Sequence, residues 1–132
     1  MSEIDAIANS ANRFQGAFKR VLCVCSAGLL RSATAAAVFS AEPYNYNTRS
    51  CGVESYALIP LSAPLLAWAD EIVCMGGEEH SRWVERHSYY KAMTENKPTI
   101  IALNIPDRYA YRNVELIELI KKNYYEKTTG VK

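Results

Sequence analysis

The sequence has no excess of charge of either sign and no long apolar run. Fifteen Lys and Arg residues stand against fourteen Asp and Glu residues, a formal net charge of +1, so no broad basic surface exists to hold nucleic acid. The longest unbroken apolar runs are far too short to span a bilayer. We therefore expect neither nucleic acid nor a membrane as a partner.

Internal repeats, low-complexity stretches and Pro- or Gly-rich linkers are missing too, so nothing indicates a domain boundary. The chain has 132 residues, 49% of them apolar, which is enough apolar material for one core. A single domain over residues 1–132 is predicted. Four cysteines occur without a recognisable signal peptide, which favours a cytoplasmic protein whose thiols stay reduced.

Histidine is scarce. His80 and His87 are the only two, and the pattern around them predicts one helix that carries both. Seven residues of helix separate them by about 10.5 Å along the axis, too far for both rings to bind one metal ion. We therefore expect no metal site, and no motif indicates an organic cofactor.

Hydrophobic periodicity predicts strands that alternate with helices. Residues 2–18 carry apolar side chains at helical spacing and predict a leading amphipathic helix that packs on the core. Apolar runs typical of buried strands and segments typical of helices then follow one another. The expected strands are 20–24, 48–53, 71–75 and 99–103, and the expected helices are 31–41, 62–68, 78–87 and a last one capped by Asn113.

This alternation predicts an α/β fold with three layers: a four-stranded parallel sheet with helices on both faces. Such sheets bind ligands beyond the carboxyl ends of their strands. The loops after Val24, Val53, Met75 and Leu103 are therefore the places where a site is expected.

The loop after the first predicted strand carries the strongest chemical signal. It lies between a buried strand and a helix start, where successive backbone N–H groups can surround an anion. The nucleophilic form of cysteine is the thiolate, which a helix N-terminus and nearby cations favour. The loop reads Cys25-Ser26-Ala27-Gly28-Leu29-Leu30-Arg31-Ser32.

Each part of this loop suits phosphoryl chemistry. Cys25 is the candidate nucleophile, Arg31 has a planar fork that matches two phosphoryl oxygens, and Ser32 is placed to hydrogen-bond the thiolate. The residues between, Ser26 to Leu30, are candidate phosphate ligands through their backbone, and Gly28 adopts a positive φ without strain. The alternative interpretation of this loop has no phosphoryl chemistry: Cys25 is a buried cysteine that ends a strand, and Arg31 is a solvent-facing arginine on the next helix.

Residues 21–35 resemble the active-site segment of the low-molecular-weight protein tyrosine phosphatases. The resemblance continues through residues 50–53 (SCGV), 68–75 (WADEIVCM) and 105–109 (IPDRY) and covers residues 20–125, with the leading helix outside it. Val24 precedes the nucleophile, where the larger tyrosine and dual-specificity phosphatases have histidine.

The resemblance implies a phosphatase that hydrolyses phosphotyrosine in a protein, or a small aryl phosphate, through a phosphocysteine on Cys25. It implies no cofactor, inhibition by phosphate or another oxyanion in the loop, and a monomer or a weak homodimer.

Such a reaction needs an acid that protonates the leaving oxygen. Only three aspartates occur. Asp5 lies in the predicted leading helix and Asp70 precedes the third strand, at the wrong end of the sheet, whereas Asp107 follows the fourth strand, at the same end as Cys25. The family places its acid in a late Asp-Pro-Tyr loop, which here has Arg108 in place of the rigid proline. The alternative role of Asp107 is structural, as a turn residue after Pro106.

The resemblance also implies the rest of the pocket. Tyr109 and Tyr56 correspond to aromatic walls around an aryl ring, and Ser50 to a serine that hydrogen-bonds the loop. Gly28 stands where the family usually has asparagine. Leu30 stands where some relatives have a second cysteine that forms a protective disulfide.

The three other cysteines are predicted to be core residues, Cys23 by strand alternation and Cys51 and Cys74 as small side chains in strands. Arsenate reductases that depend on thioredoxin share this fold, but they need a closely spaced cysteine pair after the third strand, and Cys74 has no such partner.

Two other functions remain open. IIB phosphocarriers of sugar phosphotransferase systems have a similar Cys-Ser-Ala-Gly loop, although they require neither the loop arginine nor the late acid. A non-catalytic module that binds phosphate or phosphotyrosine is favoured by the altered acid loop and by Gly28.

Overall fold

The computed structural model describes residues 19–26, 31–54, 57–106, 108 and 111–129. The predicted leading helix at 2–18 lies outside them. Strands and helices alternate along these residues, as the sequence predicts, apart from one extra short helix. The strands are β1 (Arg20–Cys25), β2 (Asn47–Gly52), β3 (Glu71–Cys74) and β4 (Thr99–Ala102), and the helices are α2 (Arg31–Ser40), α3 (Ala63–Trp68), α4 (Glu78–Arg86), α5 (Ser88–Ala92) and α6 (Val114–Thr129).

The four strands form one sheet in the order β2-β1-β3-β4, and every neighbouring pair is parallel. Val24 of β1 lies opposite Cys51 of β2 and Cys74 of β3. The carboxyl end of β1 is therefore flanked by a strand on each side, and the loops that leave β1 and β3 start next to each other.

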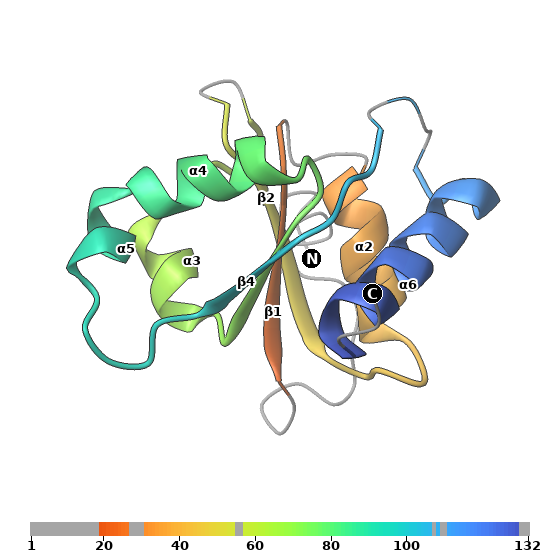
Figure 1. The fold of residues 1–132 in the computed structure, drawn as a ribbon, viewed down its shortest axis with the longest axis horizontal. Helices are drawn as coiled ribbons and strands as arrows, with labels where there is room; N and C mark the ends of the chain where they lie inside the picture. Colours follow the sequence, from red (N-terminus) through yellow and green to blue (C-terminus); the bar gives the residue numbers. More distant parts are fainter. Residues whose placement is uncertain (1–18, 27–30, 55–56, 107, 109–110, 130–132) are drawn as a thin grey trace.

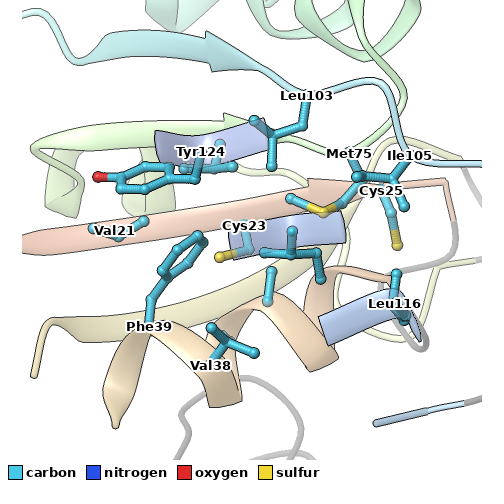
Figure 2. Packing of buried hydrophobic residues seen from close by; sticks show 14 residues of the cluster. Val21, Cys23, Cys25, Val38, Phe39, Met75, Leu103, Ile105, Leu116 and Tyr124 are labelled. Atoms are coloured by element: carbon cyan, nitrogen blue, oxygen red, sulfur yellow. The ribbon is translucent and has the colours of Figure 1, made fainter. Parts of the chain in front are cut away.

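Helices cover both faces of the sheet, which confirms the predicted three-layer α/β fold (Figure 1). Side chains alternate along β1: Val21, Cys23 and Cys25 pack with α2 and α6 on one face, whereas Leu22 and Val24 pack with α3 and α5 on the other. Figure 2 shows Cys23 and Cys25 on the same face of β1. The nucleophile predicted from the sequence therefore lies at the end of a row of core residues.

The last helix shows why the sequence folds as it does locally. The Asn113 side-chain oxygen accepts hydrogen bonds from the backbone N–H groups of Glu115 and Leu116, at 2.9 and 3.3 Å, which is the N-cap that the sequence predicts. Leu116, Ile120 and Tyr124 then lie on one buried face. The cap and the apolar stripe together set where α6 begins and which side packs on the sheet.

Two local predictions need correction. The sequence predicts Ser62 as the N-cap of the helix expected over 62–68; Ser62 does occupy the N-cap position of α3, but its side chain makes no capping hydrogen bond. The helix expected over 78–87 ends at Arg86, and His87 links it to α5, a helix of five residues that the sequence did not indicate. None of the helices in the described part of the chain is long and apolar enough to cross a membrane.

Candidate active site

The carboxyl end of β1 brings Cys25 and Ser32 into contact. Cys25 is the last residue of β1 and is only 3% exposed, and its Sγ lies 3.1 Å from the Oγ of Ser32 in the first turn of α2. The Cys25 carbonyl accepts a hydrogen bond from the Val53 N–H at 2.9 Å. Cys25 is thus fixed through its side chain to the first turn of the next helix and through its backbone to the chain that follows β2.

Arg31 is the first residue of α2, and its guanidinium is buried rather than facing solvent. The side chain donates from Nη1 to the carbonyl of Ile105 at 2.9 Å. Ile105 follows β4 and precedes the predicted acid by two residues. The alternative of a solvent-facing arginine is therefore wrong, since Arg31 bridges the start of α2 and the segment after β4.

Ser26, the residue after Cys25, is held by two neighbouring elements. Its carbonyl accepts from the Glu54 N–H at 3.0 Å, and its Oγ lies 3.1 Å from Nε2 of His80 in the first turn of α4. The opposite ring nitrogen of His80, Nδ1, accepts from the Gly76 N–H at 2.7 Å. His80 is 2% exposed.

Sequence reasoning missed this role of His80, because it considered the histidines only as metal ligands. One signal was available: Gly76 and Gly77 directly follow the strand expected over 71–75 and precede the first turn of α4. A Cβ at position 76 would lie 2.5 Å from the imidazole ring, so the glycine makes room for His80.

Several predicted site residues fall outside the residues that the structure describes: Ala27, Gly28, Leu29, Leu30, Tyr56, Asp107 and Tyr109. Their roles stay predictions. Ser50 is buried on β2, opposite Cys23 in register. Arg108 is exposed and lies 3.8 Å from the Glu115 carboxylate of α6, a distance and exposure typical of a weak ion pair.

The other three cysteines are buried in the core, as predicted. Burial raises the pKa of Cys23 and Cys51 well above the ordinary thiol value, and it raises the pKa of Cys74 to about 12. These side chains remain protonated at neutral pH, and a protonated thiol is a poor nucleophile. They therefore contribute packing rather than chemistry.

Asp70 lies at the opposite, amino end of the sheet, as predicted. Its carboxylate accepts from the backbone N–H of Arg20 at 2.9 Å and from the Arg20 guanidinium at 3.1 Å. The side-chain hydrogen bond from Arg20 holds the pKa of Asp70 below its usual value. This aspartate is thus too far along the strands to protonate a leaving group at Cys25.

Glu71, Tyr124 and Lys19 form a second polar group at the amino end. The Tyr124 hydroxyl donates to Glu71 Oε2 at 2.7 Å, and Lys19 Nζ lies 3.2 Å from Oε1. Burial, followed by the hydrogen bond to Glu71, raises the pKa of Tyr124 above its usual value. Since α6 and β3 meet here, the group links the last helix to the sheet.

Within the described ranges, no three His, Cys, Asp or Glu side chains gather as a metal site would require. A search of protein-family models and of curated proteins found no match to this chain. Function therefore has to be inferred from the residues at the carboxyl end of the sheet.

Proposed function

We propose that the protein is a cysteine-dependent phosphatase of the low-molecular-weight tyrosine phosphatase type, which hydrolyses phosphotyrosine or small aryl phosphates. The observation that carries the proposal is the 3.1 Å contact between Cys25 Sγ and Ser32 Oγ at the carboxyl end of the central strand β1. A buried arginine begins the same helix turn. A thiol in contact with a hydroxyl, with an arginine as the neighbouring residue in the chain, suits nucleophilic attack on a phosphate ester.

In the first step, the Cys25 thiolate forms a bond to phosphorus while the bond between phosphorus and the aryl oxygen breaks. Asp107 gives its proton to that oxygen, so the phenol leaves neutral. In the second step, a water molecule gives a proton to Asp107 and attacks phosphorus. The phosphorus–sulfur bond breaks, and the Ser32 hydroxyl donates a hydrogen bond to the departing thiolate.

Arg31 stabilises the phosphoryl oxygens in both steps. Its fork of N–H groups suits two equatorial oxygens, and its burial strengthens the attraction to an anion relative to water. Its bond to the Ile105 carbonyl at 2.9 Å fixes one end of the guanidinium. The side chain is thereby oriented before substrate binds, which lowers the cost of reorganisation during the reaction.

The hydrolysis of 4-nitrophenyl phosphate at mildly acidic pH, by the wild-type chain and by Cys25→Ser, tests the proposal. We expect steady turnover by the wild type and a loss of roughly 10³-fold or more in Cys25→Ser, because removal of a nucleophile abolishes the covalent route. Cys23→Ala is the matched control: it alters a buried cysteine two residues away on the same face of β1 and is expected to retain turnover.

Three outcomes would contradict the proposed phosphatase activity. Turnover that survives Cys25→Ser would remove Cys25 from the mechanism. Stoichiometric transfer from a phosphohistidine donor to Cys25 without hydrolysis would identify a phosphocarrier. Binding of phosphate or phosphotyrosine by a wild-type chain that hydrolyses neither would identify a binding module.

The acid is tested by Asp107→Asn. Turnover of an aryl ester with a poor leaving group, phenyl phosphate, is expected to fall by roughly 10²–10⁴-fold, and that of 4-nitrophenyl phosphate by less, because 4-nitrophenolate needs less protonation. Asp70→Asn, at the amino end of the sheet, is the control and is expected to leave both rates unchanged. An unchanged rate on phenyl phosphate in Asp107→Asn would reject this assignment.

A further inference from the structure

We infer that His80 is a positioning residue of the candidate active site: its neutral, Nε2-protonated ring holds the Ser26 hydroxyl so that this hydroxyl donates to a bound phosphoryl group. The inference rests on the proposed function. It assigns a task to a buried histidine that the two catalytic steps do not use.

The Gly76 backbone determines which ring nitrogen of His80 carries the proton. A backbone N–H can only donate, and it lies 2.7 Å from Nδ1, so Nδ1 accepts through its lone pair. The proton of the neutral ring is then on Nε2. Nε2 lies 3.1 Å from Ser26 Oγ and therefore donates to it.

This direction of the hydrogen bond excludes a serine–histidine nucleophile. A histidine that activates serine must accept the hydroxyl proton, and Nε2 of His80 has no lone pair for it in this form. Ser26 is thus a ligand rather than a nucleophile, and Cys25, one residue earlier, is left to attack phosphorus.

The ring of His80 has little freedom to turn. It is 2% exposed, and its Nδ1 and Nε2 are bonded to two different segments. The missing side chain at Gly76 leaves just enough room, since a Cβ there would lie 2.5 Å from the ring. His80 therefore connects the carboxyl end of β3 to the residue that follows β1, across the central strand pair of the sheet.

The Ser26 hydroxyl accepts a hydrogen bond from one group and donates its proton to another. The Nε2–H of His80 occupies a lone pair of Oγ, so the Ser26 proton is directed to a different acceptor. A phosphoryl oxygen beside Cys25 is such an acceptor. The carbonyls of Cys25 and Ser26 accept from the N–H groups of Val53 and Glu54, so the hydroxyl belongs to a backbone that is fixed at both carbonyls.

The test compares variants of His80 and Ser26 by calorimetric binding of inorganic phosphate and by kcat/KM for 4-nitrophenyl phosphate. His80→Asn keeps an acceptor for the Gly76 N–H but loses the donor to Ser26, and Ser26→Ala removes the other partner. Each is expected to weaken phosphate binding and kcat/KM by roughly tenfold, the effect of one charge-assisted hydrogen bond. The double variant is expected to be no weaker than Ser26→Ala alone.

His80→Gln is the conservative rescue, because its amide N–H reaches the position of Nε2. It is expected to recover most of the affinity that His80→Asn loses. His87→Asn is the matched control: His87 also accepts a backbone N–H at Nδ1, from Tyr89 at 3.2 Å, but it lies at the start of α5. It is expected to bind phosphate as the wild type does.

A second readout does not depend on catalysis. The chain has only two histidines, so a ¹⁵N NMR spectrum of the rings contains two sets of signals. We expect His80 to be protonated at Nε2 and unprotonated at Nδ1 near neutral pH. The opposite tautomer would overturn the inference.

Two results would overturn the role of His80 and leave the proposed phosphatase activity unaffected. One is a double variant whose losses of phosphate affinity are additive, and the other is a His80→Gln variant that binds phosphate no better than His80→Asn. A wild-type chain that neither binds nor hydrolyses phosphate esters would overturn both proposals.

Discussion

The two ends of the parallel sheet are both polar, but they are built differently. At the amino end, carboxylates meet cations of the same chain: Asp70 pairs with Arg20, and Glu71 lies between Lys19 and the Tyr124 hydroxyl. At the carboxyl end, the described contacts pair a thiol with a hydroxyl (Cys25 and Ser32), a hydroxyl with an imidazole (Ser26 and His80), and the buried Arg31 guanidinium with a backbone carbonyl.

Under the proposed function, one sheet separates the residues that stabilise the fold from those that carry out the chemistry. At the amino end, opposite charges compensate each other, and the contacts tie α6 and the start of β1 to β3. At the carboxyl end, a thiol, hydroxyls and a guanidinium belong to the residues at the end of β1 and the start of α2, and under the proposed function these groups bind an anion from outside the chain. Substitutions at the carboxyl end should therefore change activity, and those at the amino end should change stability.

The largest contrast is expected between two arginines, one at each end. Arg31→Lys keeps the charge but loses the planar fork, and kcat/KM for 4-nitrophenyl phosphate is expected to fall by roughly 10²-fold or more. Arg20→Lys, in an exposed pair, is expected to leave kcat/KM unchanged and to lower stability by less than about 1 kcal/mol. Similar losses of kcat/KM in both variants would contradict the proposed difference between the two ends of the sheet.

An intermediate effect, on stability alone, is expected for Tyr124→Phe. Loss of the 2.7 Å hydrogen bond to the buried Glu71 carboxylate is expected to lower the free energy of unfolding by about 1–3 kcal/mol. Tyr125→Phe is the control, since that ring is 61% exposed. Urea unfolding measures both, and a loss of phosphatase activity in folded Tyr124→Phe would show that the two ends are coupled.

The smallest effect concerns the dependence of stability on pH. The folded-state pKa of Asp70 lies below its unfolded value because of the Arg20 hydrogen bond. The pair therefore stabilises the fold fully above the unfolded pKa, about 3.9, and the benefit is lost as pH falls through the folded pKa.

Asp70→Asn tests this dependence by thermal unfolding. The variant is expected to be less stable than the wild type by a small and constant amount, under about 1 kcal/mol, between pH 5 and 7. The difference is expected to shrink below about pH 4. A difference that grows toward acid would contradict the assigned direction.

The sheet could be predicted because its signals are local. β1 is a continuous apolar run, Asn113 is an N-cap followed by apolar residues at helical spacing, and loops after parallel strands meet at one edge. The five residues of α5 escaped prediction because so short a segment has no measurable periodicity.

In the candidate site, a contact could be predicted only between residues that are close in the sequence. Cys25 and Ser32 belong to one loop motif and come into contact in the structure. His80 lies 54 residues from Ser26 in sequence; the glycines before it indicate room for its ring but not which loop the ring approaches. Such a contact depends on the pairing of β1 with β3, which composition and spacing do not encode.

The close approach of the Gly76 backbone to the His80 ring also constrains how this sequence can vary. A methyl group at position 76 would occupy the space of the imidazole, so Gly76→Ala is compatible with the fold only if residue 80 becomes smaller or turns away. The two positions form an epistatic pair: in a set of homologous sequences they should change together, and a histidine at 80 should occur beside a glycine at 76.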